Sequence, residues 1–285
     1  MRIAIGSGKG GTGKTTVAVS LALSLARRSV AVQLLDCDVE EPNAHLFLKY
    51  DIDTREPVKV EIPEIDENLC TKCGACAEFC NFNALAALPS KVLVFPELCH
   101  SCGGCMRVCP AKAITYNMRE LGTLEIGMTD GIQFGLGRLN VGEARATPII
   151  AQLKQYANPT RVCVLDAPPG TSCPFVEVVK DSDVCLLVTE PTPFGLNDLR
   201  LAVEVTEILG VPRAVLINRA DVGDDGVEKY CAEKGVPVLL KIPHDLAIAR
   251  AYAVGTPLVD ARPEYVDSFY SLYDKLGHMV KEQSL

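Results

Sequence analysis

A short stretch near the start of the chain has the residue types of a phosphate-binding loop. The segment Gly8–Thr15, GKGGTGKT, fits the pattern G-x-x-x-x-G-K-[ST]. Backbone N–H groups of such a loop point inward at the start of a helix and form an anion site. Lys14 is then expected to reach the β- and γ-phosphates of a nucleotide, and Thr15 to hold Mg²⁺ through its hydroxyl. The alternative is a glycine-rich turn that binds nothing. The expected nucleotide contacts in this segment are Gly8, Gly10, Gly11, Thr12, Gly13, Lys14, Thr15 and Thr16.

A second group of reactive side chains is a repeated cysteine pattern. Cys70, Cys73, Cys76 and Cys80 follow C-x₂-C-x₂-C-x₃-C, and Cys99, Cys102, Cys105 and Cys109 repeat it. Thiolates are soft ligands that suit iron–sulfur clusters. Two zinc sites are the alternative, but zinc sites usually present separated cysteine pairs.

Over roughly residues 60–118 the repeat resembles bacterial two-cluster ferredoxins. In that fold the fourth cysteine of each run ligates the other cluster. The resemblance therefore implies two [4Fe–4S] clusters with crossed ligands. The first would be held by Cys70, Cys73, Cys76 and Cys109, and the second by Cys99, Cys102, Cys105 and Cys80. Asn81 stands where proline is usual after the first run, which removes no ligand.

Alternating apolar runs place these residues in an α/β framework. Arg2–Gly6 is expected to be a strand and Thr16–Arg28 a helix, and strand–helix pairs recur from residue 161 to 254. This rhythm predicts parallel βαβ units, hence a mostly parallel sheet with helices on both faces. A closing helix over Glu264–Val280 is expected to dock on the sheet. The rhythm stops at the acidic residues 51–67. We therefore expect a main α/β domain around the phosphate-binding loop over residues 1–59 and 119–285, and an inserted α+β domain, the part that resembles ferredoxins, over 60–118.

Three carboxylates follow apolar strands. Asp36 and Asp38 come after Val30–Leu35, and Asp166 ends Arg161–Leu165. Ligands bind outside the carboxyl ends of strands in open α/β sheets, so these side chains are expected near the phosphates. An aspartate that ends an apolar strand can serve the Mg²⁺ shell. Acidic loop caps are the alternative for all three.

The loop with its second lysine, Lys9, resembles the deviant phosphate-binding loop of the MinD/ParA/NifH-type ATPases. By that resemblance Lys9 contacts phosphate across a dimer interface. Asp36–Asn43 would be switch I, with Asp38 acting on the attacking water and Asp36 supporting Mg²⁺. Residues 166–170 would be switch II, with Asp166 in the Mg²⁺ shell and Gly170 sensing the γ-phosphate. The Asn218-Arg219 pair would recognise adenine; a capping asparagine is the alternative.

Composition limits the other classes of function. The chain has 285 residues and a formal charge of −8, which disfavours a general nucleic-acid surface. It has no apolar run of membrane-spanning length. The opening residues lead directly into a strand, without a signal peptide, so a cytoplasmic protein is expected. Most of its 13 cysteines are then more plausible as metal ligands than as disulfides.

Together these features resemble MinD-superfamily ATPases that carry an inserted ferredoxin domain. The expected function is an ATP-hydrolysing homodimer, or a related heterodimer, that couples nucleotide state to electron transfer with a redox protein. The alternatives are an iron–sulfur carrier of the Mrp type and a spatial organiser of the MinD or ParA type. Three local expectations complete the set. A strand at Lys91–Phe95 has its counterpart in Ile114–Asn117, residues 129–131 form a hairpin turn, and Arg138 and Arg145 are solvated loop residues.

Overall fold

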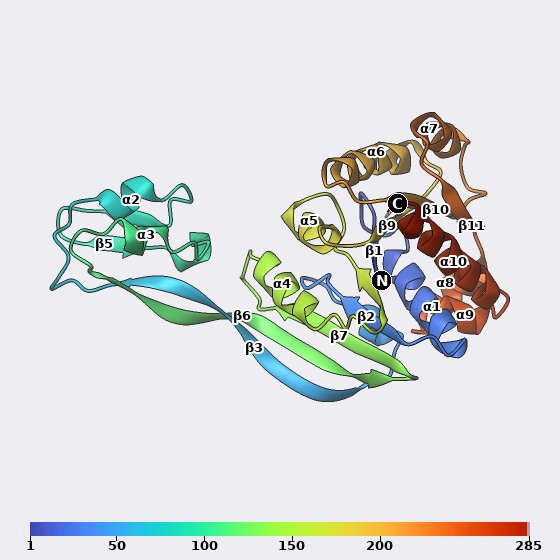
Figure 1. Cartoon of the computed structure of the whole chain (residues 1–285), viewed down its shortest axis with the longest axis horizontal. Helices are drawn as coiled ribbons and strands as arrows, with labels where there is room; N and C mark the ends of the chain where they lie inside the picture. The colour runs from blue at the N-terminus through green and yellow to red at the C-terminus, as the bar shows by residue number, and fades with distance from the viewer. Residues whose placement is uncertain (284–285) are drawn as a thin grey trace.

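The computed structural model describes residues 1–283, and its centre is a sheet of nine strands (Figure 1). The strand order is β11-β10-β9-β1-β8-β2-β7-β6-β3. Neighbours from β11 to β7 are parallel, whereas β6 pairs antiparallel with both β7 and β3. The mostly parallel sheet expected from the sequence is therefore present. Its strands are β1 Arg2–Gly6, β2 Val32–Asp36, β3 Asp51–Ile65, β6 Ile114–Thr129, β7 Ile132–Leu139, β8 Val162–Asp166, β9 Val184–Thr189, β10 Arg213–Asn218 and β11 Val238–Ile242.

Helices cover both faces of this sheet, as the strand–helix rhythm predicted. One face carries α1, α9 and α10, and the other carries α4 to α7. The closing helix α10 buries Phe269 and Leu276 against the first face, so it docks on the sheet as expected. No helix of the described chain is long and apolar enough to cross a membrane. The helices are α1 Lys14–Arg27, α4 Thr147–Gln155, α5 Cys173–Val179, α6 Pro193–Ile208, α7 Gly226–Lys234, α8 Leu246–Ala253, α9 Leu258–Ala261 and α10 Tyr265–Gln283, with a 3₁₀ helix at Ala44–Leu46.

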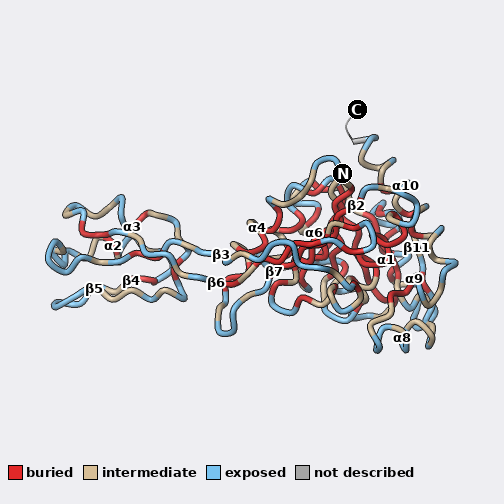
Figure 2. Tube along the Cα trace, turned by 90° about the horizontal axis from the view of Figure 1, so that it is seen from below, coloured by how far each residue is buried: buried red, intermediate tan, exposed pale blue. Residues whose placement is uncertain are grey.

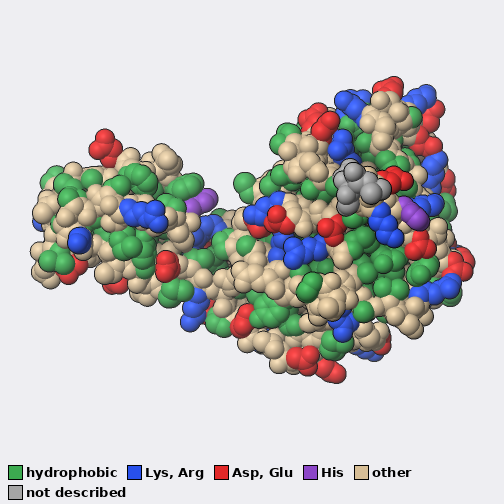
Figure 3. All heavy atoms as spheres, in the orientation of Figure 1, with side chains coloured by type: hydrophobic (Ala, Val, Ile, Leu, Met, Phe, Trp, Pro, Cys, Tyr) green, Lys and Arg blue, Asp and Glu red, His purple; other side chains and the backbone are tan. Residues whose placement is uncertain are grey.

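Two long strands carry the cysteine-rich segment away from the sheet (Figure 1). β3 and β6 pair along their whole length, from Asp51 opposite Met128 to Ile65 opposite Ile114. The expected domain boundaries, 60 and 119, lie opposite each other within this ladder. The sequence suggested an insertion boundary at 51–67 without indicating a strand, and the structure has β3 over Asp51–Ile65. Because β3 is an edge strand, Pro57 and Pro63 are tolerated within it. The space-filling view shows the cysteine-rich lobe set apart from the larger body (Figure 3).

The cysteine-rich lobe contains little regular structure and few buried residues, as the burial colouring shows (Figure 2). Its elements are α2 Ala75–Phe79, β4 Leu85–Ala87, β5 Val92–Val94, a 3₁₀ helix at Pro96–Leu98 and α3 Gly104–Arg107. The strand expected near 91–95 is present as β5, and its expected counterpart, residues 114–117, forms the start of β6. β5 pairs with β4, which precedes it by a short connection, while residues 114–117 pair with β3.

The hairpin expected after residue 119 is confirmed. β6 and β7 are joined through Asp130 and Gly131, whose φ values of 44° and 80° suit a two-residue turn. Arg138 and Arg145 were expected to be solvated loop residues, and this is wrong for the exposure of Arg145. Arg138 lies in β7 and is exposed, whereas Arg145 is buried, 8% exposed, and donates to the Cys99 carbonyl. That contact spans 46 residues of sequence, so no local pattern could indicate it.

Candidate nucleotide and cluster sites

The phosphate-binding loop joins β1 to α1 and is shaped by its glycines. Gly11 and Gly13 have φ values of +77° and +96°, a region that favours glycine, and α1 begins at Lys14. Gly8 approaches α6 so closely that a Cβ atom there would overlap the Asp198 carbonyl oxygen. The loop therefore aims its N–H groups from the start of a fourteen-residue helix into the space beside it.

A pocket of about 440 Å³ lies beside this loop. It is lined by the loop, by switch I residues Asp38, Glu41 and Asn43, and by the end of β11 with α8. Nine of the residues expected at the nucleotide line it, namely Gly10, Gly11, Gly13, Lys14, Thr15, Thr16, Asp38, Asn218 and Arg219. Six do not, namely Gly8, Lys9, Thr12, Asp36, Asp166 and Gly170. Ile242, Pro243, His244, Ile248 and Tyr252 supply an apolar and aromatic end suited to a base.

Three carboxyl groups and one lysine interact electrostatically beside the phosphate-binding loop. Asp36 and Asp166 are fully buried opposite each other on β2 and β8. Burial raises the pKa of Asp36 to about 7. Burial also raises the pKa of Asp38 to about 6, although the positive charge of Lys14 acts to lower it. Burial also raises the pKa of Asp166 well above its usual value, and the neighbouring Asp36 charge adds to this. Burial lowers the pKa of Lys14, against the Coulombic effect of Asp166 and Asp38.

The two strand-end carboxylates differ in their partners. Asp36 accepts backbone N–H bonds from Asp38, Asn43 and Ala44 at 2.9–3.1 Å, so it holds the switch I loop. Asp166 is fully buried, and the Thr15 hydroxyl and the Lys14 charge beside it act against the rise of its pKa. A buried carboxylate next to a hydroxyl is a donor set that suits Mg²⁺. The residues present therefore fit a magnesium ion held by Thr15 and Asp166, with Asp36 shaping the loop around it.

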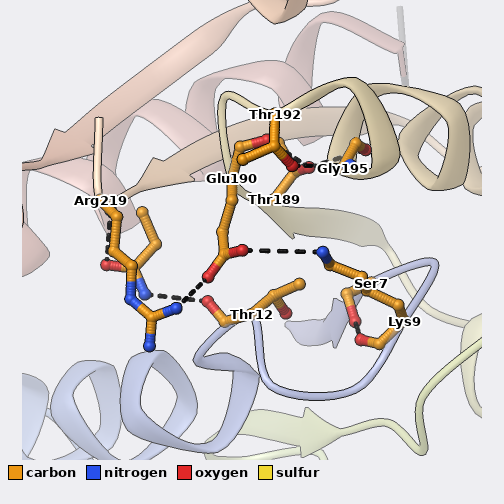
Figure 4. Close-up of polar contacts among 9 residues, drawn as sticks. Ser7, Lys9, Thr12, Thr189, Glu190, Thr192, Gly195 and Arg219 are labelled. Atoms are coloured by element: carbon orange, nitrogen blue, oxygen red, sulfur yellow. Dashed lines mark hydrogen bonds and ion pairs between the residues drawn. The ribbon is translucent and has the colours of Figure 1, made fainter. Parts of the chain in front are cut away.

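A carboxylate outside the expected site residues connects the loop to β9 and β10. Glu190 follows β9, forms an ion pair with Lys9 at 3.6 Å and accepts a hydrogen bond from Arg219 at 2.6 Å (Figure 4). Its side chain is 12% exposed, whereas the Lys9 side chain is 32% exposed. The ion pair with Glu190 therefore holds Lys9 at the surface, outside the nucleotide pocket of the same chain. The strand-end rule that indicated Asp166 applies equally to Glu190 and could have singled it out.

Asn218 and Gly170 use their polar groups within the protein. The Asn218 amide donates to the Thr12 carbonyl at 2.9 Å, and its oxygen accepts from the Arg219 N–H. Asn218 thus stabilises the phosphate-binding loop, and its second amide N–H is not used by this bond. The Gly170 N–H donates to the Ser7 carbonyl at 3.1 Å. A contact with a γ-phosphate would require Gly170 to leave that carbonyl.

The cysteine-rich lobe contains two cavities, each lined by four cysteines. Cys70, Cys73, Cys76 and Cys109 line one, and Cys80, Cys99, Cys102 and Cys105 line the other. Each cavity thus combines three cysteines of one run with the fourth cysteine of the other. This is the grouping that the ferredoxin resemblance implied, and it arises because α2 and α3 pack against each other.

Three of these cysteines accept backbone hydrogen bonds at sulfur, whereas burial raises the pKa of Cys76 and Cys105. Backbone N–H groups of Ala84, Ser101 and Ala113 donate to the sulfurs of Cys80, Cys99 and Cys109 at 3.3–3.4 Å. Such bonds stabilise negative sulfur and tune a cluster's potential. Across residues 1–283, no group of three His, Cys, Asp or Glu side chains could hold a single metal ion. Four thiols at each cavity form a donor set of the kind that iron–sulfur clusters take.

Comparison with known proteins identifies the larger body. The profile of the CobQ/CobB/MinD/ParA nucleotide-binding domain matches residues 3–258. The chain belongs to this family. It is an ATPase of the MinD/ParA type, and its nine-stranded sheet with the loop at β1 is the fold of that type.

Relatives of this ATPase extend over almost the whole chain. An uncharacterised protein of Methanocaldococcus jannaschii is 32% identical over 98% of both chains. A protein named iron-sulfur cluster carrier protein, from Pyrococcus horikoshii, is 28% identical over 99% of this chain and 87% of its own. Among solved structures, the septum site-determining protein MinD of P. horikoshii, in complex with Mg-ADP, has a TM-score of 0.59. It is 19% identical, over 96% of this chain and 95% of its own.

The carboxyl cluster of this ATPase predicts an unusual dependence of stability on pH. Asp36 and Asp38 have native pKa values of about 7 and about 6. An aspartate in an unfolded chain has a pKa of about 3.9. Between these values the native state binds more protons than the unfolded state, so stability falls as pH rises from about 4 towards 7 and levels off above.

This dependence can be measured by urea unfolding between about pH 5.5 and 7.5 in Mg²⁺-free buffer, with iron content followed in parallel. We expect Asp38→Asn to show a shallower fall than the wild type, and saturating Mg²⁺ to flatten the wild-type curve. Equal slopes in the wild type and Asp38→Asn would contradict the assignment.

Proposed function

We propose that this ATPase binds and hydrolyses Mg-ATP as a dimer, carries two [4Fe–4S] clusters, and couples its nucleotide state to electron transfer with a redox protein. The observation that carries the proposal is the pair of four-cysteine cavities, held by a hairpin that is continuous with the ATPase sheet. Cys70, Cys73, Cys76 and Cys109 would hold one cluster, and Cys80, Cys99, Cys102 and Cys105 the other. The division into an ATPase domain at 1–59 and 119–285 and a cluster domain at 60–118 is part of this proposal.

The nucleotide half of the proposal assigns roles to residues around the pocket. Lys14 and the loop N–H groups would bind the β- and γ-phosphates, and Thr15 with Asp166 would hold Mg²⁺. Asp38 lines the pocket and its raised pKa suits a group that orients or accepts a proton from water. Lys9 would leave Glu190 and contact the phosphates of a second copy when ATP closes the dimer.

The surface of the cluster domain supports access by a redox protein. Cys73 and Cys102 are exposed, one at each cavity. Exposed apolar side chains border the second cavity, namely Phe79 at 48% and Phe82 at 41%. An exposed cluster edge within an apolar rim is the kind of surface on which short-lived redox complexes form.

A carrier of clusters is the second candidate, because relatives that match nearly the whole chain bear that name. In the resembled Mrp-type carriers a C-x-x-C pair of the ATPase domain holds the transferred cluster. The corresponding part of this chain has Cys185 and Cys231, which are buried in the core at 0% and 1% exposure. Buried and separated thiols cannot present a labile bridging cluster, so electron transfer is favoured.

The test is a redox titration of anaerobically purified protein by EPR, with and without Mg-ATP, together with iron analysis. We expect about eight iron atoms per chain and a cluster potential that differs between the two conditions. Retention of iron after incubation with an apo-ferredoxin acceptor separates the candidates. A full iron complement with identical potentials in both conditions would contradict nucleotide-coupled electron transfer, and rapid loss of iron to the acceptor would favour the carrier.

A further inference from the structure

Residues 139–146 run from the last residue of β7 to the start of α4. They touch the nucleotide side of the molecule at Leu139. The Leu139 N–H donates to the carbonyl of Val39, which directly follows Asp38, at 2.8 Å. Two residues earlier on β7, a Cβ at Gly137 would stand 2.7 Å from a Val39 methyl carbon. Such close packing leaves little room for switch I and the end of β7 to move independently. A displacement of Val39 must therefore displace Leu139.

The other end of the segment touches the cluster domain. Arg145 donates through Nη1 to the carbonyl of Cys99, one of the four cysteines of the second cavity. The Arg145 side chain is buried, and its Nε and Nη2 atoms have no hydrogen-bond partner in the described chain. A buried cation with unpaired donors is costly unless negative charge lies nearby. Glu97 interacts electrostatically with Arg145, and a cluster held by thiolates at Cys99 would add negative charge beside it.

A pair of salt bridges joins the same two stretches. Arg119 of β6 bonds Glu97 at 3.0 Å and Glu143 at 2.5 Å. Glu97 precedes Cys99 by two residues, and Glu143 precedes Arg145 by two. No comparable bond joins the cysteines of the first cavity to the ATPase body among residues 1–283. Within that range, only the second cavity is therefore connected to the nucleotide side in this way.

We propose that residues 139–146, acting through Arg145, couple switch I to the cluster at Cys80, Cys99, Cys102 and Cys105. This cluster, and not the one at Cys70, Cys73, Cys76 and Cys109, responds to nucleotide. The inference rests on the proposed function for the presence of the clusters. Arg145 is a positioning residue: it holds the Cys99 backbone, and its charge raises the reduction potential of the adjacent cluster. Coupling requires only that nucleotide favour one position of switch I.

Hydrogen–deuterium exchange of the oxidised holoprotein tests this coupling without any electron-transfer assay. We expect Mg-ATP to change amide exchange by at least about threefold in residues 97–105, with little change in residues 70–76. Arg145→Met keeps an unbranched, mostly apolar side chain but removes the charge and donors, and is expected to abolish the change at 97–105 while nucleotide still binds. Arg138→Met, on exposed β7 surface in the same part of the chain, is the matched control and should retain the change.

The outcomes separate this inference from the proposed function. An unchanged response in Arg145→Met, an equal response at 70–76, or no response at 97–105 in the wild type would overturn the coupling through Arg145. Identical cluster potentials with and without Mg-ATP, combined with a response at 97–105 that Arg145→Met abolishes, would overturn only the electron-transfer role. If Arg145→Met loses iron, Arg145→Lys decides: it restores charge and one donor, and should keep iron and part of the response.

Discussion

Replacement of Lys14 by alanine is expected to reduce nucleotide affinity by at least about 100-fold. Truncating one member of a buried, charge-assisted contact typically costs ~2–5 kcal/mol, and ~2.7 kcal/mol corresponds to about 100-fold. Lys14 is 7% exposed and lines the pocket. Its removal also takes away the positive charge that offsets the negative charges of Asp38 and Asp166. These carboxylates would then repel phosphate.

Lys9→Ala is the matched comparison, since it removes the same type of side chain from the other lysine of the same loop. Lys9 does not line the pocket of its own chain and pairs with Glu190 instead. We expect less than about threefold loss of nucleotide affinity but loss of ATP-dependent dimerisation, because the partner's phosphates would lack this cation. Titration with a fluorescent nucleotide and light scattering with and without ATP measure the two effects. Equal loss of affinity in both variants would contradict the division of roles.

These expectations could be made from sequence because the phosphate-binding loop is a local structure. Gly11, Gly13 and Lys14 are neighbours in the chain, and the φ values of the two glycines follow from the same pattern that indicates phosphate. The positions of Asp38 and Asp166 followed from a general rule about the carboxyl ends of parallel strands. The cysteine grouping followed from a repeat whose spacing is itself typical of the fold.

What the sequence did not predict depends on contacts between distant segments. Arg145 is interpreted as a loop arginine from its neighbours, because its partner, the Cys99 carbonyl, lies 46 residues away. The hydrogen bond from the Asn218 amide to the Thr12 carbonyl spans 206 residues and was likewise not indicated by the sequence. β3 was missed because its prolines argue against a central strand, and only the sheet order reveals that it is an edge.

The crossed grouping of the cysteines predicts which pairs of substitutions remove one cluster and which remove two. Cys76→Ala with Cys109→Ala takes two cysteines from one cavity, so the second cluster should remain. Cys76→Ala with Cys80→Ala takes one cysteine from each cavity, so both clusters should be damaged. Both double variants remove the same number of thiols and share Cys76, which makes each the control for the other.

Iron and acid-labile sulfide per chain, measured after anaerobic purification, distinguish the two variants. We expect about four iron atoms in Cys76→Ala/Cys109→Ala and far fewer in Cys76→Ala/Cys80→Ala, against about eight in the wild type. Cys37→Ala, which removes a buried thiol of the ATPase core, should keep about eight. If each cysteine run held its own cluster, the two double variants would exchange their iron contents, because Cys76 and Cys80 would then belong to one cluster and Cys109 to the other. The iron content of these two nearly identical variants therefore decides which cluster Cys80 and Cys109 each ligate.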